Sequence, residues 1–149
     1  MLVVMYKFLD YRVGDVMTRE VVAIRPETSI AEIEELFDRK GFEALPVLDG
    51  AGLLVGIVSR LDVLRAFHFT PESIVPRYDD VRQRPARSVM TLQPLAVEPD
   101  LPLTRLLETL VETRVKSLPV VEGGRLVGIV SREDLIRALR RAAAEEHPP

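Results

Sequence analysis

The chain of 149 residues is 47% hydrophobic and 29% charged, which is the composition of a folded globular protein of one domain or two very small ones. It has no cysteine, which excludes a disulfide scaffold, a cysteine nucleophile and any metal site built on thiolates. The net charge of −3 disfavours a dedicated nucleic-acid binder, and no N-terminal apolar run has the length of a signal peptide or membrane helix, so we expect a cytoplasmic protein.

The first half of the chain predicts a strand, a helix, two strands and a helix, in that order. Turn residues and capping residues mark the boundaries of these elements. The expected elements are a strand at 21–24, a helix opened by a Ser29 capping box and closed by Gly41, a hairpin of strands 45–48 and 53–58 around the turn 49–52, and a helix over 62–67.

The second half follows the same plan. We expect Asp100 to cap a helix, the Gly123-Gly124 pair to turn a tight hairpin, and Ser131 to begin the last helix. The tail from Glu145 onward is expected to fray. Four leucines are predicted to face inward from the first of these helices: Leu103, Leu106, Leu107 and Leu110.

Three sequence blocks occur twice in the same order, which identifies an internal duplication. Val16-Met17-Thr18 recurs 73 residues later, as does Leu45-Pro46-Val47, and Gly56–Asp62 recurs 72 residues later with six of seven residues identical. Short helical segments are expected to lead into each repeat, at 11–17 and 86–90, whereas the first ten residues have no evident counterpart. We therefore divide the chain into an N-terminal extension (1–11), repeat 1 (12–67), a linker (68–85), repeat 2 (86–141) and a frayed tail (142–149).

Each repeat of about 55 residues is marginal as an independent core. Its strands are apolar on both faces and need cover on both sides. The sequence therefore predicts an α+β fold (α/β in some schemes) in which two β-α-β-β-α repeats pack sheet to sheet about a pseudo-twofold axis. That arrangement leaves a cleft with two related pockets.

The repeated motifs resemble those of a tandem pair of CBS domains, the regulatory modules named after cystathionine β-synthase. The motifs are Asp15-Val16-Met17-Thr18, the doubled Leu-Pro-Val, and the doubled Gly-Ile-Val-Ser-Arg-x-Asp, and together they span roughly residues 12–140. The resemblance implies a Bateman-type module that binds AMP, ADP, ATP or S-adenosylmethionine between its repeats and signals to a partner. It also implies a homodimer of pairs and no catalytic activity. The chain shows no Gly-rich phosphate loop, nucleophile–base pair or metal-ligand cluster.

Two ligand pockets follow from the resemblance, each with residues from both repeats. In each, an aspartate would hold the ribose hydroxyls, a serine would meet phosphate or ribose, and an arginine would add charge and hydrogen-bond donors. Adenine would sit against the first two strands of the other repeat. One pocket would comprise Ser131, Arg132 and Asp134 with Thr18, Val22, Phe42 and Ala44. The other would comprise Ser59, Arg60 and Asp62 with Thr91, Leu95, Val115 and Ser117.

The same residues allow plainer interpretations. Each Ser-x-x-Asp also fits a helix capping box that needs no ligand, and Arg60 and Arg132 also fit a solvated surface. Met17 and Met90 fit core positions better than functional ones. A ligand-free dimerisation module is therefore the alternative function.

The two repeats differ just before their Leu-Pro-Val strands, where Lys116 occupies the position of Glu43. A cation there favours a polyphosphate and a carboxylate opposes it. Arg19 adds a second cation beside Thr18. We therefore hypothesise that the Asp134 pocket binds phosphorylated ligands more tightly than the Asp62 pocket. The alternative is that Glu43 and Lys116 pair with each other.

Overall fold

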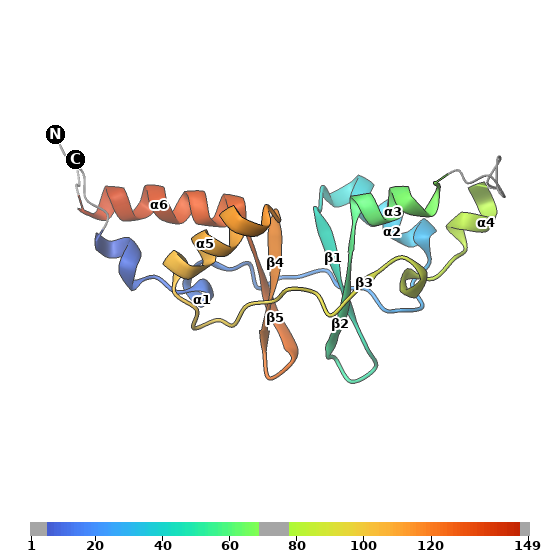
Figure 1. Ribbon diagram of the computed structural model, residues 1–149, viewed down its shortest axis with the longest axis horizontal. Coiled ribbons are helices and arrows are strands. Elements are labelled where there is room, and N and C mark those ends of the chain that lie inside the picture. The colour runs from blue at the N-terminus through green and yellow to red at the C-terminus, as the bar shows by residue number, and fades with distance from the viewer. Residues whose placement is uncertain (1–5, 69–77, 147–149) are drawn as a thin grey trace. The chain divides into compact units, whose positions relative to one another are not determined.

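The computed structural model describes residues 6–68 and 78–146. The chain forms two compact units (Figure 1). One unit, called unit 1, combines the chain up to Val21 with the chain from Leu95 onward. The other, unit 2, runs from Val22 to Pro94. The segment that leads into each repeat, called its lead-in, therefore folds with the body of the other repeat.

Unit 2 is built on an antiparallel hairpin of β1 (Ala44–Leu48) and β2 (Leu54–Ser59). The two-residue strand β3 (Thr91–Leu92) pairs with the outer side of β2 and comes from the lead-in of repeat 2. Helices α2 (Ile30–Lys40) and α3 (Arg60–Ala66) complete the body. The core gathers the apolar side chains of these elements, including Ile30, Ile33, Phe37, Leu45, Val47 and Val58.

Unit 1 repeats this design with β4 (Ser117–Glu122), β5 (Arg125–Ser131), α5 (Leu103–Thr113) and α6 (Arg132–Glu146). Thr18 exchanges two backbone hydrogen bonds with Ile129 of β5, at 2.8 and 2.9 Å, and so takes the place that β3 has in unit 2. Both helices lie toward one end of the hairpin, and the β4–β5 turn projects beyond them (Figure 1). Its two glycines have φ of 60° and 80°, which confirms the predicted tight turn.

Four short helices form the lead-ins: η1 (Tyr6–Asp10) with α1 (Val13–Val16), and α4 (Tyr78–Arg82) with η2 (Ala86–Ser88). Phe8 and Val81 lie 73 residues apart, and each is buried in the core of its unit. The expectation that the first ten residues have no counterpart was therefore wrong. The correspondence rests on one buried side chain in each copy, so sequence identity does not reveal it.

The lead-in methionines pack over the central strands, as predicted for core side chains. A Cβ added to Gly128 would lie 2.7 Å from the sulfur of Met17, and one added to Gly56 would lie 2.9 Å from that of Met90. Such separations are sterically forbidden, so the strands need glycine where the lead-in crosses. This contact explains why both glycines recur in the duplicated motif.

Two predicted elements differ in the structure. Residues 21–24 form no strand, because only Ile24 pairs, through one parallel bridge to Val47, before the turn at Pro26. Asp100 does not cap α5, whose N-cap is Pro102; the backbone N–H of Leu103 instead donates to the Tyr11 carbonyl at 3.0 Å. A backbone carbonyl of the lead-in thus accepts a hydrogen bond at the start of α5, where the sequence predicted the Asp100 side chain.

The leucine stripe and the C-terminal tail also need correction. Leu103, Leu106 and Leu110 are buried as predicted, but Leu107 is 37% exposed. The predicted fraying from Glu145 is wrong as far as Glu146, where α6 ends. Glu145 is held by a hydrogen bond from Tyr11 and one from Arg141, at 2.8 and 3.1 Å. Residues 147–149 lie outside the described part of the chain.

Candidate functional site

The first predicted site residues, Ser59 and Asp62, form a complete capping box at the start of α3. The Ser59 hydroxyl accepts from the Asp62 backbone N–H at 3.2 Å, and Asp62 Oδ2 accepts from the Ser59 N–H at 2.9 Å. Asp62 is 4% exposed, and its Oδ1 pairs with Nη1 of Arg65 at 3.3 Å. One oxygen of this buried carboxylate thus holds the backbone, and the other faces an arginine.

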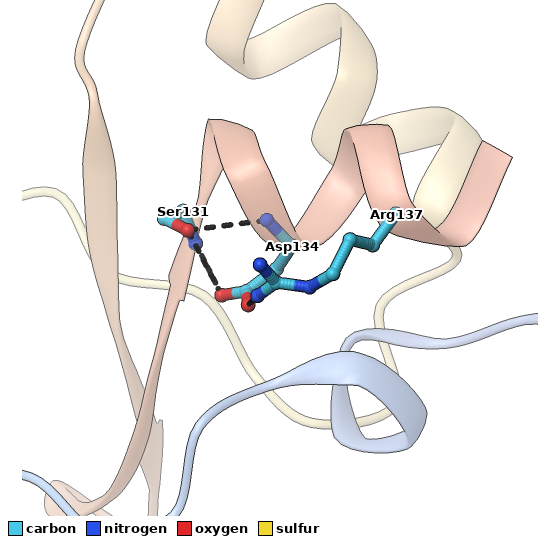
Figure 2. Close-up of polar contacts among 3 residues, drawn as sticks. All are labelled: Ser131, Asp134 and Arg137. Atoms are coloured by element: carbon cyan, nitrogen blue, oxygen red, sulfur yellow. Dashed lines mark hydrogen bonds and ion pairs between the residues drawn. The ribbon is translucent and has the colours of Figure 1, made fainter. Parts of the chain in front are cut away.

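The second serine–aspartate pair repeats this geometry at the start of α6 (Figure 2). Asp134 Oδ2 accepts from the Ser131 N–H at 2.9 Å and from its hydroxyl at 3.0 Å. Arg137 forms a hydrogen-bonded ion pair with Oδ1. The capping interpretation is therefore correct for both motifs. Asp134 is buried, whereas the Arg137 side chain that pairs with its Oδ1 is 66% exposed.

The two motif arginines bind the backbone of their own units, and the interpretation of them as purely solvated is wrong. Arg60 Nε donates to the Phe42 carbonyl at 2.8 Å, and its guanidinium lies 5.5 Å from the centre of the Phe37 ring. Arg132 Nε donates to the Val115 carbonyl at 3.0 Å. Both arginines tie the start of a helix to the segment that leads into a strand.

The structure brings Thr91 and Asp62 into one cavity of about 360 Å³ in unit 2. Arg65, Arg84 and Ser88 also line it, and none of these three was predicted. Arg65 follows its aspartate by one helical turn, a spacing that places two side chains on one helix face. Arg84 and Ser88 lie in the lead-in of the other repeat, and no local pattern connects them to Asp62.

The structure distributes the remaining predicted residues over both units. Unit 1 contains, with Ser131, Arg132 and Asp134, the residues Thr18, Arg19, Leu95, Val115, Lys116 and Ser117. Unit 2 contains, with Ser59, Arg60, Asp62 and Thr91, the residues Val22, Phe42 and Ala44. Each predicted pocket therefore takes its aspartate and threonine from one unit and its strand residues from the other. The ligand contacts of these residues stay predictions.

The described residues form no metal-ligand cluster and no membrane-spanning helix. Within residues 6–68 and 78–146, no three His, Asp or Glu side chains are grouped so that they could hold a metal ion. Over the same ranges, no helix has both the length and the apolar character needed to cross a membrane.

Comparison with known proteins identifies the repeats. The model of the CBS domain family matches residues 13–69 and 86–141. CBSX2, a chloroplastic CBS domain-containing protein of Arabidopsis thaliana, is 31% identical over 150 residues, which cover 86% of this chain and 63% of that protein. The A-adding tRNA nucleotidyltransferase of Geobacter sulfurreducens is 31% identical over 124 residues. The chain spans only 13% of that enzyme.

Solved structures share the architecture. The crystal structure of CBSX2 in complex with AMP matches with a TM-score of 0.76 at 32% identity, covering 88% of this chain and 97% of that one. The CBS domain pair of protein MJ0100, solved with 5-methylthioadenosine and S-adenosyl-L-methionine, matches with a TM-score of 0.71 over 87% and 96%. At 23% identity, the second likeness concerns the fold alone.

Proposed function

The chain belongs to the CBS domain family, and from that premise we propose that it is a non-catalytic regulatory module for an adenosyl ligand. The ligand class comprises AMP, ADP, ATP and S-adenosylmethionine, bound between the two repeats. The observation that carries the proposal is the buried acid at the start of α3, which shares a polar cavity with Thr91. The AMP complex of the relative CBSX2 supports the same ligand class.

The geometry of the two aspartates suits a ribose. A carboxylate accepts several hydrogen bonds, and Oδ2 of each aspartate is committed to its helix cap. Oδ1 pairs with Arg65 or Arg137, whose side chains are 67% and 66% exposed. A carboxylate oxygen accepts more than one hydrogen bond, so Oδ1 can keep its arginine and still accept a hydrogen bond from a ribose. The ribose hydroxyls would then donate to Oδ1.

The proposed pockets keep the residues that the resemblance implies. Thr18 and Thr91 would contact the nucleoside beside the aspartate of their own unit. Strand residues from the other unit would hold adenine. A ligand that bridges both repeats changes their arrangement only by binding one arrangement more tightly than another. We propose that this difference is the signal passed to a partner protein.

We also propose a homodimer. The supporting observation is an apolar groove of about 340 Å³ between α5 and α6 of unit 1. Leu107, Val111 and Ile136 line it and are 37%, 67% and 56% exposed. Apolar side chains gathered in one exposed groove are typical of an interaction surface, and twofold dimers are the commonest assemblies.

The second candidate function is a ligand-free dimerisation module. The observation that favours it is that both capping boxes are complete, with each aspartate oxygen already partnered inside the chain. Under this alternative the aspartates serve helix starts alone.

Thermal unfolding with added nucleotides separates the two functions. A ligand at 100 times its dissociation constant stabilises the folded state by about 2.7 kcal/mol, which raises the unfolding temperature of a chain of this size by several degrees. We expect AMP, ADP, ATP or S-adenosylmethionine to give that rise and the guanosine nucleotides to give none. Asp62→Asn with Asp134→Asn should abolish it.

Asp100→Asn is the matched control, because Asp100 is an exposed aspartate that caps nothing and lies outside both pockets. It should preserve the full rise. If no adenosyl compound raises the unfolding temperature of the unmodified protein, the regulatory proposal fails and the dimerisation module replaces it.

A further inference from the structure

The cavity beside Asp62 is cationic at its rim. Arg65, Arg84, Ser88 and Thr91 line it around the single carboxylate of Asp62. Two arginines therefore line the same cavity as one buried acid, and two hydroxyls add donors. Such a set suits a ligand that carries hydroxyl groups for the carboxylate and an anionic group for the arginines.

The backbone of Arg84 is firmly placed. Its carbonyl accepts from the Ile30 N–H at 2.9 Å, and its own N–H donates to the Val81 carbonyl at 3.0 Å. Ala86, two residues further on, is completely buried. The Arg84 side chain thus leaves a backbone that is hydrogen-bonded to Ile30 of α2 and to Val81 of α4.

Arg65 is positioned by the acid it covers. Its Nη1 lies 3.3 Å from Asp62 Oδ1, which uses one of the five N–H donors of a guanidinium. The remaining donors are available to a phosphate, which guanidinium groups bind well through paired hydrogen bonds. Asp62 itself repels a phosphate, so the carboxylate and the arginines recognise different parts of one ligand.

Unit 1 keeps a counterpart of Arg65, which is Arg137, but carries no cation at the positions of Arg84 and Ser88. At the 73-residue offset, Tyr11 stands for Arg84 and Asp15 stands for Ser88. The Tyr11 hydroxyl donates to Glu145 at 2.8 Å, and the Asp15 carboxylate accepts from the Arg12 N–H at 2.8 Å. Arg19, which adds a cation near Thr18, donates to the Gly14 carbonyl at 3.4 Å.

From this contrast we infer that the Asp62 cavity is selective for a phosphorylated nucleoside, with Arg84 as the phosphate-specificity residue. The inference rests on the proposed function and names the ligand class of one of its two sites. It opposes the preference predicted from Lys116 and Glu43, which favours the Asp134 pocket. One set of measurements decides between them.

Calorimetric titration with AMP and with adenosine tests the inference, since the pair differs only in the phosphate. Asp134→Asn serves as the background in which the Asp62 cavity is the remaining site. In that background we expect Arg84→Gln to weaken AMP about tenfold, as for loss of a charge-assisted hydrogen bond, and to leave adenosine within about twofold. Arg84→Lys, which keeps the charge, should recover most of the AMP affinity.

Arg87→Gln is the matched control. It removes the same charge from an exposed arginine three residues away that does not line the cavity, and it should leave both affinities unchanged. In an Asp62→Asn background, Arg84→Gln should have no effect on AMP. Equal weakening of AMP and adenosine by Arg84→Gln, or an unchanged AMP affinity, overturns the inference.

The inference and the proposed function fail in different ways. If the unmodified protein binds neither compound, the adenosyl function is wrong and the inference fails with it. If both compounds bind and Arg84→Gln leaves the ratio of their affinities unchanged, the proposed regulatory function stands and only the phosphate assignment is overturned. Thermal unfolding of each variant without ligand checks that every chain is folded.

Discussion

Asp62 and Asp134 are buried carboxylates whose two oxygens have different partners. Oδ2 satisfies the backbone at a helix start, and Oδ1 meets an exposed arginine. A capping role and a binding role are therefore compatible in one side chain, because they use separate oxygens. At this scale, ligand binding by the Asp62→Asn and Asp134→Asn variants decides whether the aspartates serve only as caps or also as binding residues.

Replacing Gly128 should destabilise the folded chain, because the lead-in of repeat 1 lies against it. Its added Cβ would lie 2.7 Å from the Met17 sulfur and 2.9 Å from the Thr18 carbonyl oxygen, which belongs to backbone. Overpacking of this kind costs about 1–3 kcal/mol, so we expect Gly128→Ala to lower the free energy of unfolding by that amount. Urea denaturation measures it.

Gly50→Ala is the control for that substitution. Nothing lies within 4 Å of a Cβ added there, so its effect should stay within about 0.5 kcal/mol. Equal effects of the two substitutions would show that the Met17 contact yields easily and does not explain the glycine.

Among the elements, the lead-in of repeat 1 and the end of α6 are joined by one polar cluster. The Tyr11 hydroxyl and Arg141 both donate to Glu145, and Arg141 lies 5.7 Å from the centre of the Tyr11 ring. The hydrogen bonds from Tyr11 and then from Arg141 hold the pKa of Glu145 below its ordinary value. Partial removal from water and the bond to Glu145 raise the pKa of Tyr11.

The directions of these two pKa shifts predict the pH range in which the cluster stabilises the folded state. A lowered acid pKa stabilises the folded state above the ordinary pKa, and that stabilisation is lost as pH falls through the lowered value. A raised tyrosine pKa stabilises the folded state below the ordinary pKa, and that stabilisation is lost as pH rises through the raised value. The cluster should therefore hold α6 best near neutral pH.

Tyr11→Phe tests the cluster. It removes a donor to Glu145, so we expect the pKa of that carboxyl to rise toward its ordinary value and the last turn of α6 to exchange its amide hydrogens faster. NMR titration and hydrogen exchange measure the two effects. Tyr78→Phe, which removes a hydroxyl bonded to Glu34 in unit 2, should leave α6 unchanged. Unaltered exchange in Tyr11→Phe would mean that apolar packing alone holds this helix end.

The whole chain consists of two units that exchange their lead-ins, so neither repeat completes its own sheet. Thr18 borders β5 of repeat 2, and β3 of the repeat 2 lead-in borders β2 of repeat 1. Unit 1 also presents the apolar groove between α5 and α6. That groove is the surface at which we propose that a second copy packs.

Val111→Asp tests the proposed homodimer at that groove. The side chain is 67% exposed, so an aspartate there leaves the folded chain intact but places a charge in any apolar interface. We expect light scattering coupled to gel filtration to show a monomer where the unmodified protein is a dimer. Leu61→Asp, at a site that is 55% exposed on α3 and does not line this groove, should preserve the dimer. A dimer in both variants would place the interface elsewhere.

Much of the fold followed from local pattern. The hairpins, the Ser29 and Gly41 helix boundaries and the tandem repeats are confirmed, since turn residues, caps and duplication are visible in neighbouring positions. The strand at 21–24 and the Asp100 cap were wrong because partners distant in sequence decide them. Arg84 and Ser88 were missed for the same reason.

The sequence by itself determined that this protein is a tandem CBS pair with two serine–aspartate motifs at helix starts, because those features are local and doubled. Only the tertiary structure decided which lead-in completes which sheet and that Arg84 joins Asp62 in one cavity. The physical reason is that these pairings join residues far apart in the chain. Their free energy comes from packing and hydrogen bonds that exist only once both units have formed.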